Sequence, residues 1–276
     1  MAKAFGPVPL AILMCLLLVA GCAATTANVH VDNRVRVKPV FLVPSDAVPP
    51  PAESSDLLMK HLAWSQKRYR ELLSCSDTFE IADGKPLMLA GQHDTAYYLA
   101  QTDGGAEACL QELFVHDRVD RLSCPFIYVV CFVGTGSYPA GGGRPINGGL
   151  NTGGGVVILA TDGLAAPNFQ STLRHELGHA FGLPHVDVYG YDMLTSPSLM
   201  SYNPAHHTNG FADSATPGAL IPEDLRALNQ VKRVFPSFVL DPARDQPAGY
   251  TPAPEVLLGP MHIAGQPDYT GPSIVE

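Results

Sequence analysis

The chain has 276 residues, enough for one domain with a sizeable core or for two small ones. It carries 26 acidic residues against 17 lysines and arginines, so its formal net charge is −9. A field of this sign does not draw a protein towards nucleic acid or anionic lipid, so partners recruited by basic charge are excluded. No nucleic-acid partner is expected, and the chain is expected to be a monomer.

The N-terminus has the parts of an export signal. A basic start at Lys3 is followed by an apolar run from about Val8 to Ala20 and then by Gly21. This run is too short to be a good membrane-spanning helix. Residues 1–21 are therefore interpreted as a signal peptide that is removed, with a transmembrane anchor or a buried helix as the alternative.

The string "VAGC", residues 19–22, resembles the lipobox of bacterial lipoproteins, although Val stands where Leu is commoner. The resemblance implies that Cys22 is acylated, for example with palmitate, and that residues 22–28 tether an exported chain to a membrane surface without spanning it. Ala23 replaces the aspartate that favours inner-membrane retention in many Gram-negative lipoproteins. An outer-membrane address is therefore favoured if the source is Gram-negative.

Four cysteines remain after the signal and the lipidation site: Cys75, Cys109, Cys124 and Cys131. An even number in an exported chain predicts one or two disulfides and leaves three pairings open. Buried free thiols are the alternative, since Cys131 lies inside an apolar run where a small hydrophobic side chain would fit.

Hydrophobic periodicity predicts strands and helices that mix without regular alternation, so the fold class is α+β. The predicted strands are 35–44, 85–91, 125–134 and 156–163, and the predicted helices are about 53–73, 105–118, one following 163, and 222–235. The strand at 125–134 is almost wholly apolar and is expected to be buried on both faces. The glycine-rich segment 134–155 cannot be regular helix; it is either a surface loop or a lining of a ligand site.

The helix after residue 163 contains "RHELGHAFGLPH", residues 174–185. Each helical residue advances about 100°, so His175 and His179 project from the same face, one turn apart. Two imidazoles can then reach one zinc ion. Glu176 points elsewhere and is placed to act on a water, as the general base of the H-E-x-x-H arrangement.

A catalytic zinc needs a third protein ligand and an open position. Gly182 can end the helix in a left-handed conformation, and Pro184 cannot continue it. The chain is therefore predicted to turn, so that His185 reaches the ion. Each of these residues alone could be an ordinary surface or core side chain. Together, their spacing is the one that a zinc site with three histidine ligands and a general base requires.

The full string H-E-x-x-H-x-x-G-x-x-H resembles the signature of the metzincin clan of zinc metalloproteases. Downstream, "SLMSY", residues 198–202, resembles the metzincin Met-turn, in which Met200 would pack beneath the histidines. In astacins and serralysins a tyrosine two residues later binds zinc and stabilises the tetrahedral intermediate; Tyr202 matches that position. Val186 differs from the residue after the third histidine in the best-known subfamilies, so no subfamily is assigned.

This resemblance implies a twisted mixed β-sheet over an active-site helix, with an irregular lower subdomain that ends in a C-terminal helix. Residues 29–236 are expected to form the catalytic domain, and residues 237–276 a tail rich in Pro and Gly. The implied function is a zinc-dependent endopeptidase that hydrolyses protein or peptide substrates, with the glycine-rich segment or its flanks as one wall of the cleft. The alternatives are a zinc-dependent amidase acting on a cell-wall component and a non-catalytic zinc-containing binding lipoprotein. Asp187 and Asp192 are candidates to orient a ligand histidine.

Overall fold

A computed structural model describes residues 33–134, 141–147, 154–206 and 218–246. The predicted signal peptide, Cys22, the tether 22–28 and residues 247–276 of the predicted tail lie outside these ranges. In the part of the chain that is described, no helix is long and apolar enough to cross a membrane.

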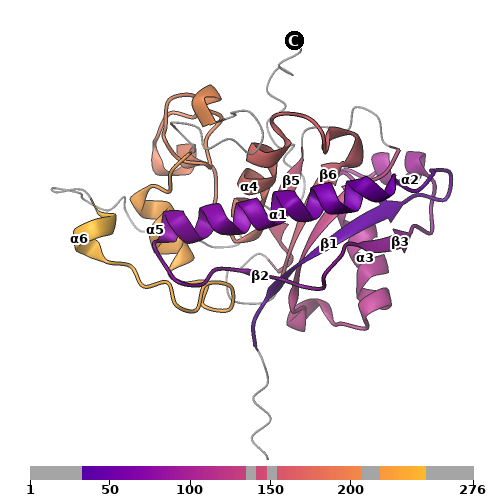
Figure 1. The fold of residues 1–276 in the computed structure, drawn as a ribbon, viewed down its shortest axis with the longest axis horizontal. Coiled ribbons are helices and arrows are strands. Elements are labelled where there is room, and N and C mark those ends of the chain that lie inside the picture. The colour runs from indigo at the N-terminus through magenta and orange to yellow at the C-terminus, as the bar shows by residue number, and fades with distance from the viewer. Residues whose placement is uncertain (1–32, 135–140, 148–153, 207–217, 247–276) are drawn as a thin grey trace, which may run out of the picture. The chain divides into compact units, whose positions relative to one another are not determined.

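A six-stranded mixed sheet forms the centre of the unit that begins at Arg34 (Figure 1). Its strands are β1 (Arg36–Val43), β2 (Glu80–Ile81), β3 (Leu87–Ala90), β4 (Phe126–Phe132), β5 (Gly142–Pro145) and β6 (Gly155–Ala160). The order is β2-β1-β4-β6-β5, with β3 also paired to β1. All neighbours run parallel except β5, which is antiparallel to β6. The predicted α+β class with a mixed sheet is confirmed.

The central strands are buried on both faces because helices cover each side. In β4 every residue after Phe126 is buried, as its apolar run predicts. Alternate residues of β1 enter different cores: Val37 and Phe41 join one, while Val40 and Leu42 join the other. The sheet is therefore the middle layer of the fold.

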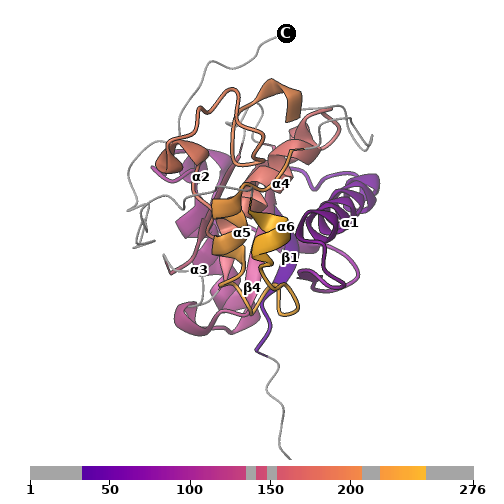
Figure 2. The ribbon, with the colours of Figure 1, turned by 90° about the vertical axis from the view of Figure 1, so that its left-hand side faces the viewer.

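The helices are α1 (Ala52–Leu73), α2 (Thr95–Leu99), α3 (Ala106–Asp117), α4 (Phe169–Ala180), α5 (Pro222–Leu228) and α6 (Pro242–Asp245). The buried apolar residues of α1 and α4 belong to one core and those of α3 to the other. Figure 2 shows α1 on one side of the sheet and α2 and α3 on the other. The predicted helices at 53–73 and 105–118 are confirmed, whereas β2, α2 and α6 were not predicted.

The predicted helix at 222–235 is shorter than expected, because α5 ends at Leu228. The chain continues in tight turns, in which the Val231 amide donates to the Leu228 carbonyl at 3.0 Å and the Val234 amide donates to the Val231 carbonyl at 3.0 Å. Turns of this pitch still bury Val231 and Phe235. The apolar residues that suggested a longer helix are thus buried by consecutive turns. Core packing also reaches beyond residue 236, since Phe238 is 1% exposed.

The prediction of disulfides is wrong, and the alternative of buried free thiols is confirmed for three of the four cysteines, since Cys75 is half-buried. All four cysteines of the described chain are free. Cys109, Cys124 and Cys131 are buried within the two cores. Burial raises the pKa of the Cys109 and Cys131 thiols, so both behave as small apolar side chains.

Candidate metal centre

The helix that carries the motif, α4, lies directly against the sheet. Leu173 and Leu177 on its apolar side are fully buried. The backbone of β6 approaches closely at Gly155, where an added Cβ would lie 2.8 Å from the Ala180 carbonyl oxygen. Packing of this kind fixes the helix relative to the strands, and therefore fixes the side chains that leave its other face.

The end of α4 turns as the sequence predicts. Gly182 has a φ of 96°, a left-handed conformation that glycine adopts without a Cβ clash. The Gly182 amide donates to the His179 carbonyl at 2.8 Å, and the Leu183 amide donates to the Gly178 carbonyl at 2.9 Å. These bonds close the helix in the manner of a Schellman motif. The extended backbone at His185 then returns that side chain to the helix.

The structure brings the three predicted histidines together. The Nε2 atom of His175 lies 3.2 Å from that of His179 and 3.2 Å from that of His185, and the third separation, between His179 and His185, is 3.0 Å. Within the described ranges, this trio is the one group of three or more His, Cys, Asp or Glu side chains arranged to hold a metal ion. His175 is buried and the other two are half-buried.

Two backbone carbonyls fix the orientation of the imidazoles. The Nδ1 atom of His175 lies 2.7 Å from the Leu199 carbonyl oxygen, and that of His179 lies 2.7 Å from the Leu183 carbonyl oxygen. A carbonyl only accepts, so both Nδ1 atoms carry the proton and both Nε2 atoms present a lone pair. These acceptors have no signature in the sequence, and sequence reasoning missed them.

The donor set fits a tetrahedral cation. Lone pairs that converge within 3.2 Å repel one another unless a positive charge lies between them. Three nitrogens at the corners of a tetrahedral zinc site would be about 3.3–3.4 Å apart, given Zn–N distances of about 2.0–2.1 Å. The observed separations of 3.0 to 3.2 Å are close to that value. Three imidazoles also leave one corner of a tetrahedron for another ligand.

Tyr202 lies at the edge of the histidine cluster. Its hydroxyl oxygen is 3.0 Å from Nε2 of His185. The ring stacks on His175 with centroids 5.5 Å apart. The Tyr202 amide donates to the Met193 carbonyl at 2.8 Å, which anchors the backbone while the phenol reaches the site.

Met200 packs against α4 at Gly178. It is fully buried, and a Cβ built on Gly178 would lie 2.3 Å from its sulfur. The close contact is therefore possible only because residue 178 has no side chain. This packing places Met200 against the turn of α4 between His175 and His179.

We expect Gly178→Ala to destabilise the protein by about 1–3 kcal/mol, because the added methyl group overlaps the end of the Met200 side chain, which is fully buried and must shift within a packed core. Gly84→Ala is the control, since nothing lies within 4 Å of a Cβ added there. Denaturant unfolding of both variants measures the difference. Equal stability of the two variants would contradict the packing described for Met200.

A buried aspartate holds the turn that carries Met200. Oδ2 of Asp224, on α5, accepts from the Ser198 hydroxyl at 2.7 Å and from the Ile221 amide at 3.1 Å. The Ser198 oxygen in turn accepts from the Met200 amide at 3.0 Å. This chain of bonds fixes the segment whose Leu199 carbonyl orients His175. Sequence reasoning missed Asp224, which resembles any acid in the first turn of a helix.

Glu176 lies on the turn of α4 that packs against β5. It is 8% exposed, and a Cβ on Gly141 would lie 3.3 Å from its Cγ. A Cβ on Gly143 would lie 2.1 Å from the Glu176 carbonyl oxygen. The glycine-rich segment thus contains a strand that was not predicted, and its glycines let that strand lie on the turn of helix that bears Glu176.

The two acids proposed to orient a ligand histidine do not do so in this structure. Asp187 accepts from the Val188 amide at 3.0 Å, and Asp192 accepts from the Leu194 and Thr195 amides at 2.9 Å each. Both side chains therefore stabilise their own turns, which is the usual behaviour of aspartate in loops.

Among known proteins, the chain shows similarity to solved structures, and to no protein-family model or curated protein. The first structure is wild-type OgpA from Akkermansia muciniphila, which is 17% identical with a TM-score of 0.46; the match covers 76% of this chain and 64% of that one. A second crystal form is 18% identical with a TM-score of 0.45, covering 76% and 63%. Catalytically inactive OgpA in complex with an O-glycopeptide, glycodrosocin, is 15% identical with a TM-score of 0.44, again covering 76% and 63%. This chain spans less than two thirds of the length of these proteins.

Proposed function

We propose that the chain is a zinc-dependent endopeptidase of the metzincin kind. The observation that carries the proposal is the convergence of three Nε2 atoms within 3.2 Å. Two of these histidines lie on α4, where Glu176 directly follows His175. His175, His179 and His185 would hold the ion, and Met200 would support them from below. Once bound, zinc supplies a Lewis acid that polarises a carbonyl and lowers the pKa of a water towards about 7.

Glu176 would move the proton in this reaction. Its side chain leaves the turn of α4 that packs against β5, and its Cγ would lie 3.3 Å from a Cβ added at Gly141, the residue before β5. We assign it the role of general base towards the attacking water and then of general acid towards the leaving amine. Tyr202, with its hydroxyl beside His185, would donate to the oxyanion that forms on the substrate carbonyl.

The test of the proposed function is cleavage-site profiling in a proteome-derived peptide mixture, with glycosylated and unmodified forms of the same peptides and with purified cell-wall material as separate arms. Cleavage of peptide bonds that stops with chelator and returns with zinc is expected. Release of amines from the cell-wall arm alone would favour the amidase. Stoichiometric zinc without cleavage in any arm would favour the non-catalytic binding lipoprotein.

We also propose that Cys22 is acylated and anchors the exported chain to the bacterial membrane. The support is the lipobox-like string at residues 19–22. Replacing the cysteine removes the acceptor thiol, so Cys22→Ala is expected to move the protein from the membrane fraction to the soluble fraction and to abolish palmitate labelling. Cys75→Ala is the matched control. Labelling of the Cys22→Ala protein at the level of the unaltered chain would exclude this anchor.

A further inference from the structure

The edge strand β5 has a composition that does not favour a strand. Its four residues, Gly142 to Pro145, include two glycines, which gain nothing from side-chain packing, and a proline, which has no amide proton. Arg144 is the one residue of β5 with a long side chain. The strand nevertheless pairs with β6 along its whole length, so other contacts must hold it there.

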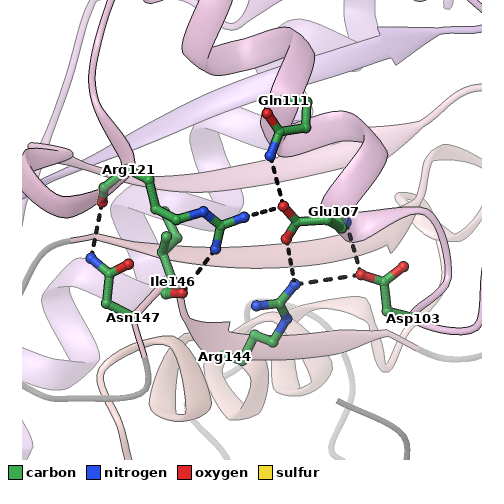
Figure 3. A network of polar contacts seen from close by, with 7 residues as sticks. All are labelled: Asp103, Glu107, Gln111, Arg121, Arg144, Ile146 and Asn147. Atoms are coloured by element: carbon green, nitrogen blue, oxygen red, sulfur yellow. Dashed lines mark hydrogen bonds and ion pairs between the residues drawn. The ribbon is translucent and has the colours of Figure 1, made fainter. Parts of the chain in front are cut away.

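The two faces of β5 meet different partners. The Cβ direction of Gly143 points at the Glu176 carbonyl on α4, at a distance of 2.1 Å for an added Cβ. Successive residues of a strand point to opposite faces, so Arg144 projects away from α4. Its guanidinium lies beside α3, where Nη2 is 3.4 Å from Asp103 Oδ2 and 3.5 Å from Glu107 Oε2 (Figure 3).

Glu107 is in turn held by further groups (Figure 3). It pairs with the Arg121 guanidinium and accepts from the Gln111 amide at 2.8 Å. Arg121 Nη1 also donates to the Ile146 carbonyl at 3.2 Å, and the Arg121 carbonyl accepts from the Asn147 side chain at 2.9 Å. The network thus contacts β5 through the Arg144 side chain and contacts the two residues that follow it, Ile146 and Asn147.

The alternation of the ladder shows which backbone groups of β5 face outward. The Ile146 amide donates to the Gly154 carbonyl at 2.9 Å, so residues 142, 144 and 146 direct their backbone groups to β6. Gly143 therefore directs its amide and carbonyl to the opposite edge, which no described strand occupies. A peptide pairing with this edge would meet Gly143, directly over the helical turn of Glu176.

We propose that Arg144 is a positioning residue for the peptidase cleft, and that its network with Asp103, Glu107 and Arg121 keeps the Gly143 edge over Glu176 ready to pair with an extended substrate. This inference depends on the proposed function. The network lies on the face of β5 remote from the histidines, so it acts on substrate pairing and not on the metal site.

The test is Arg144→Met, compared with Arg36→Met as the matched control. Arg36 is an arginine of β1, which is not a neighbour of β5 in the sheet. Its Nε lies 3.1 Å from a carboxylate oxygen of Glu80 on β2. Without the ion pairs of Arg144, β5 should spend less time in the position in which its edge can pair with a peptide. KM for a long peptide should therefore rise about three- to tenfold, while kcat should change less than about twofold. The shortest peptide that is cleaved should show little change, and Arg144→Lys should recover part of the loss.

The dependence of KM on salt concentration is a second test, because a side chain that acted only by packing would not make KM depend on ionic strength. Added salt screens exposed ion pairs, so KM of the unaltered enzyme for the long peptide should rise with ionic strength, and that of Arg144→Met should not. An unchanged KM in Arg144→Met, or the same loss in Arg36→Met, would overturn the inference while leaving the peptidase intact.

Hydrogen exchange tests the inference without turnover, so its failure can be separated from failure of the proposed function. The register directs the Arg144 amide to β6, and the Ile146 amide bonds to Gly154, directly before β6. Both amides should exchange about three- to tenfold faster in Arg144→Met, because exchange reports local opening of the strand. Exchange in Arg36→Met should match the unaltered chain at these positions. Unchanged protection in Arg144→Met would refute the positioning role whether or not any peptide is cleaved.

Discussion

Glu176→Gln is expected to lower kcat for peptide cleavage by about 10²–10⁴-fold, the contribution typical of a positioned general base. Glu176 is 8% exposed, on the turn of α4 that packs against β5. The glutamine side chain has nearly the shape of the glutamate side chain, so the variant should keep the same packing contacts. It cannot accept a proton from water at neutral pH. KM should change little, because the proposed pairing of the substrate backbone with the edge strand does not involve this group.

Zinc content must be measured on the same preparation. The proposed ligands are the three Nε2 atoms, and Glu176 is not among them, so Glu176→Gln should retain the zinc of the unaltered protein. Glu80→Gln, a change at a partly exposed residue of β2, is the matched control and should keep full activity. Full activity in a zinc-loaded Glu176→Gln protein would contradict the assigned role.

Asp224→Asn is expected to change how stability depends on pH. Burial raises the pKa of Asp224 from 3.8 to about 7, even though hydrogen bonds from Ser198 and the Ile221 amide oppose the shift. Oδ2 accepts both of those bonds, and Oδ1 is buried with no hydrogen-bond partner among the described residues. The proton therefore belongs on Oδ1, where the Asn variant has its NH₂ group.

The sign follows from where the proton is held. Between about pH 4 and pH 7 the folded chain keeps a proton on Asp224 that the unfolded chain has released, so the free energy of unfolding falls as pH rises. The contribution is fully present below about pH 4 and is lost above about pH 7, with an upper bound of about 4 kcal/mol for a shift of this size. Asp224→Asn has no charge to release, so this part of the slope should disappear.

Denaturant unfolding at about pH 5 and about pH 8 measures the effect, as the stability of Asp224→Asn minus that of the unaltered chain. We expect this difference to increase with pH. Asp192→Asn serves as control, because that carboxyl is exposed and its pKa is lowered by the Thr195 hydroxyl and the Leu194 amide. A difference that stays constant between the two pH values would mean that Asp224 is already ionised in the folded protein.

The histidine cluster could be predicted because its geometry is local. The helical repeat alone places His175 and His179 on one face, and Gly182 and Pro184 indicate where the helix must end. The return of His185 needs only a few residues of chain after that turn. The structure brings all three together, with Nε2 atoms at most 3.2 Å apart.

Features that depend on distant partners could not be predicted. β5 consists of glycines, an arginine and a proline, and it is a strand because β6 and the Arg144 network hold it. Asp224 differs from an ordinary acid of a helix start only through its burial and its bond to Ser198. The even number of cysteines was misleading for the same reason, since the two cores bury Cys109, Cys124 and Cys131 as single thiols.

Zinc titration of chelator-stripped protein tests the central claim most directly, because it links the three histidines, one ion and peptide cleavage in a single measurement. Peptidase activity should rise in proportion to added zinc and reach its maximum at one zinc per chain. His179→Ala, which removes one of the three Nε2 atoms, should bind zinc weakly and remain inactive throughout. Full activity of the stripped protein, or equal activity of the His179→Ala protein, would contradict a catalytic zinc held by His175, His179 and His185.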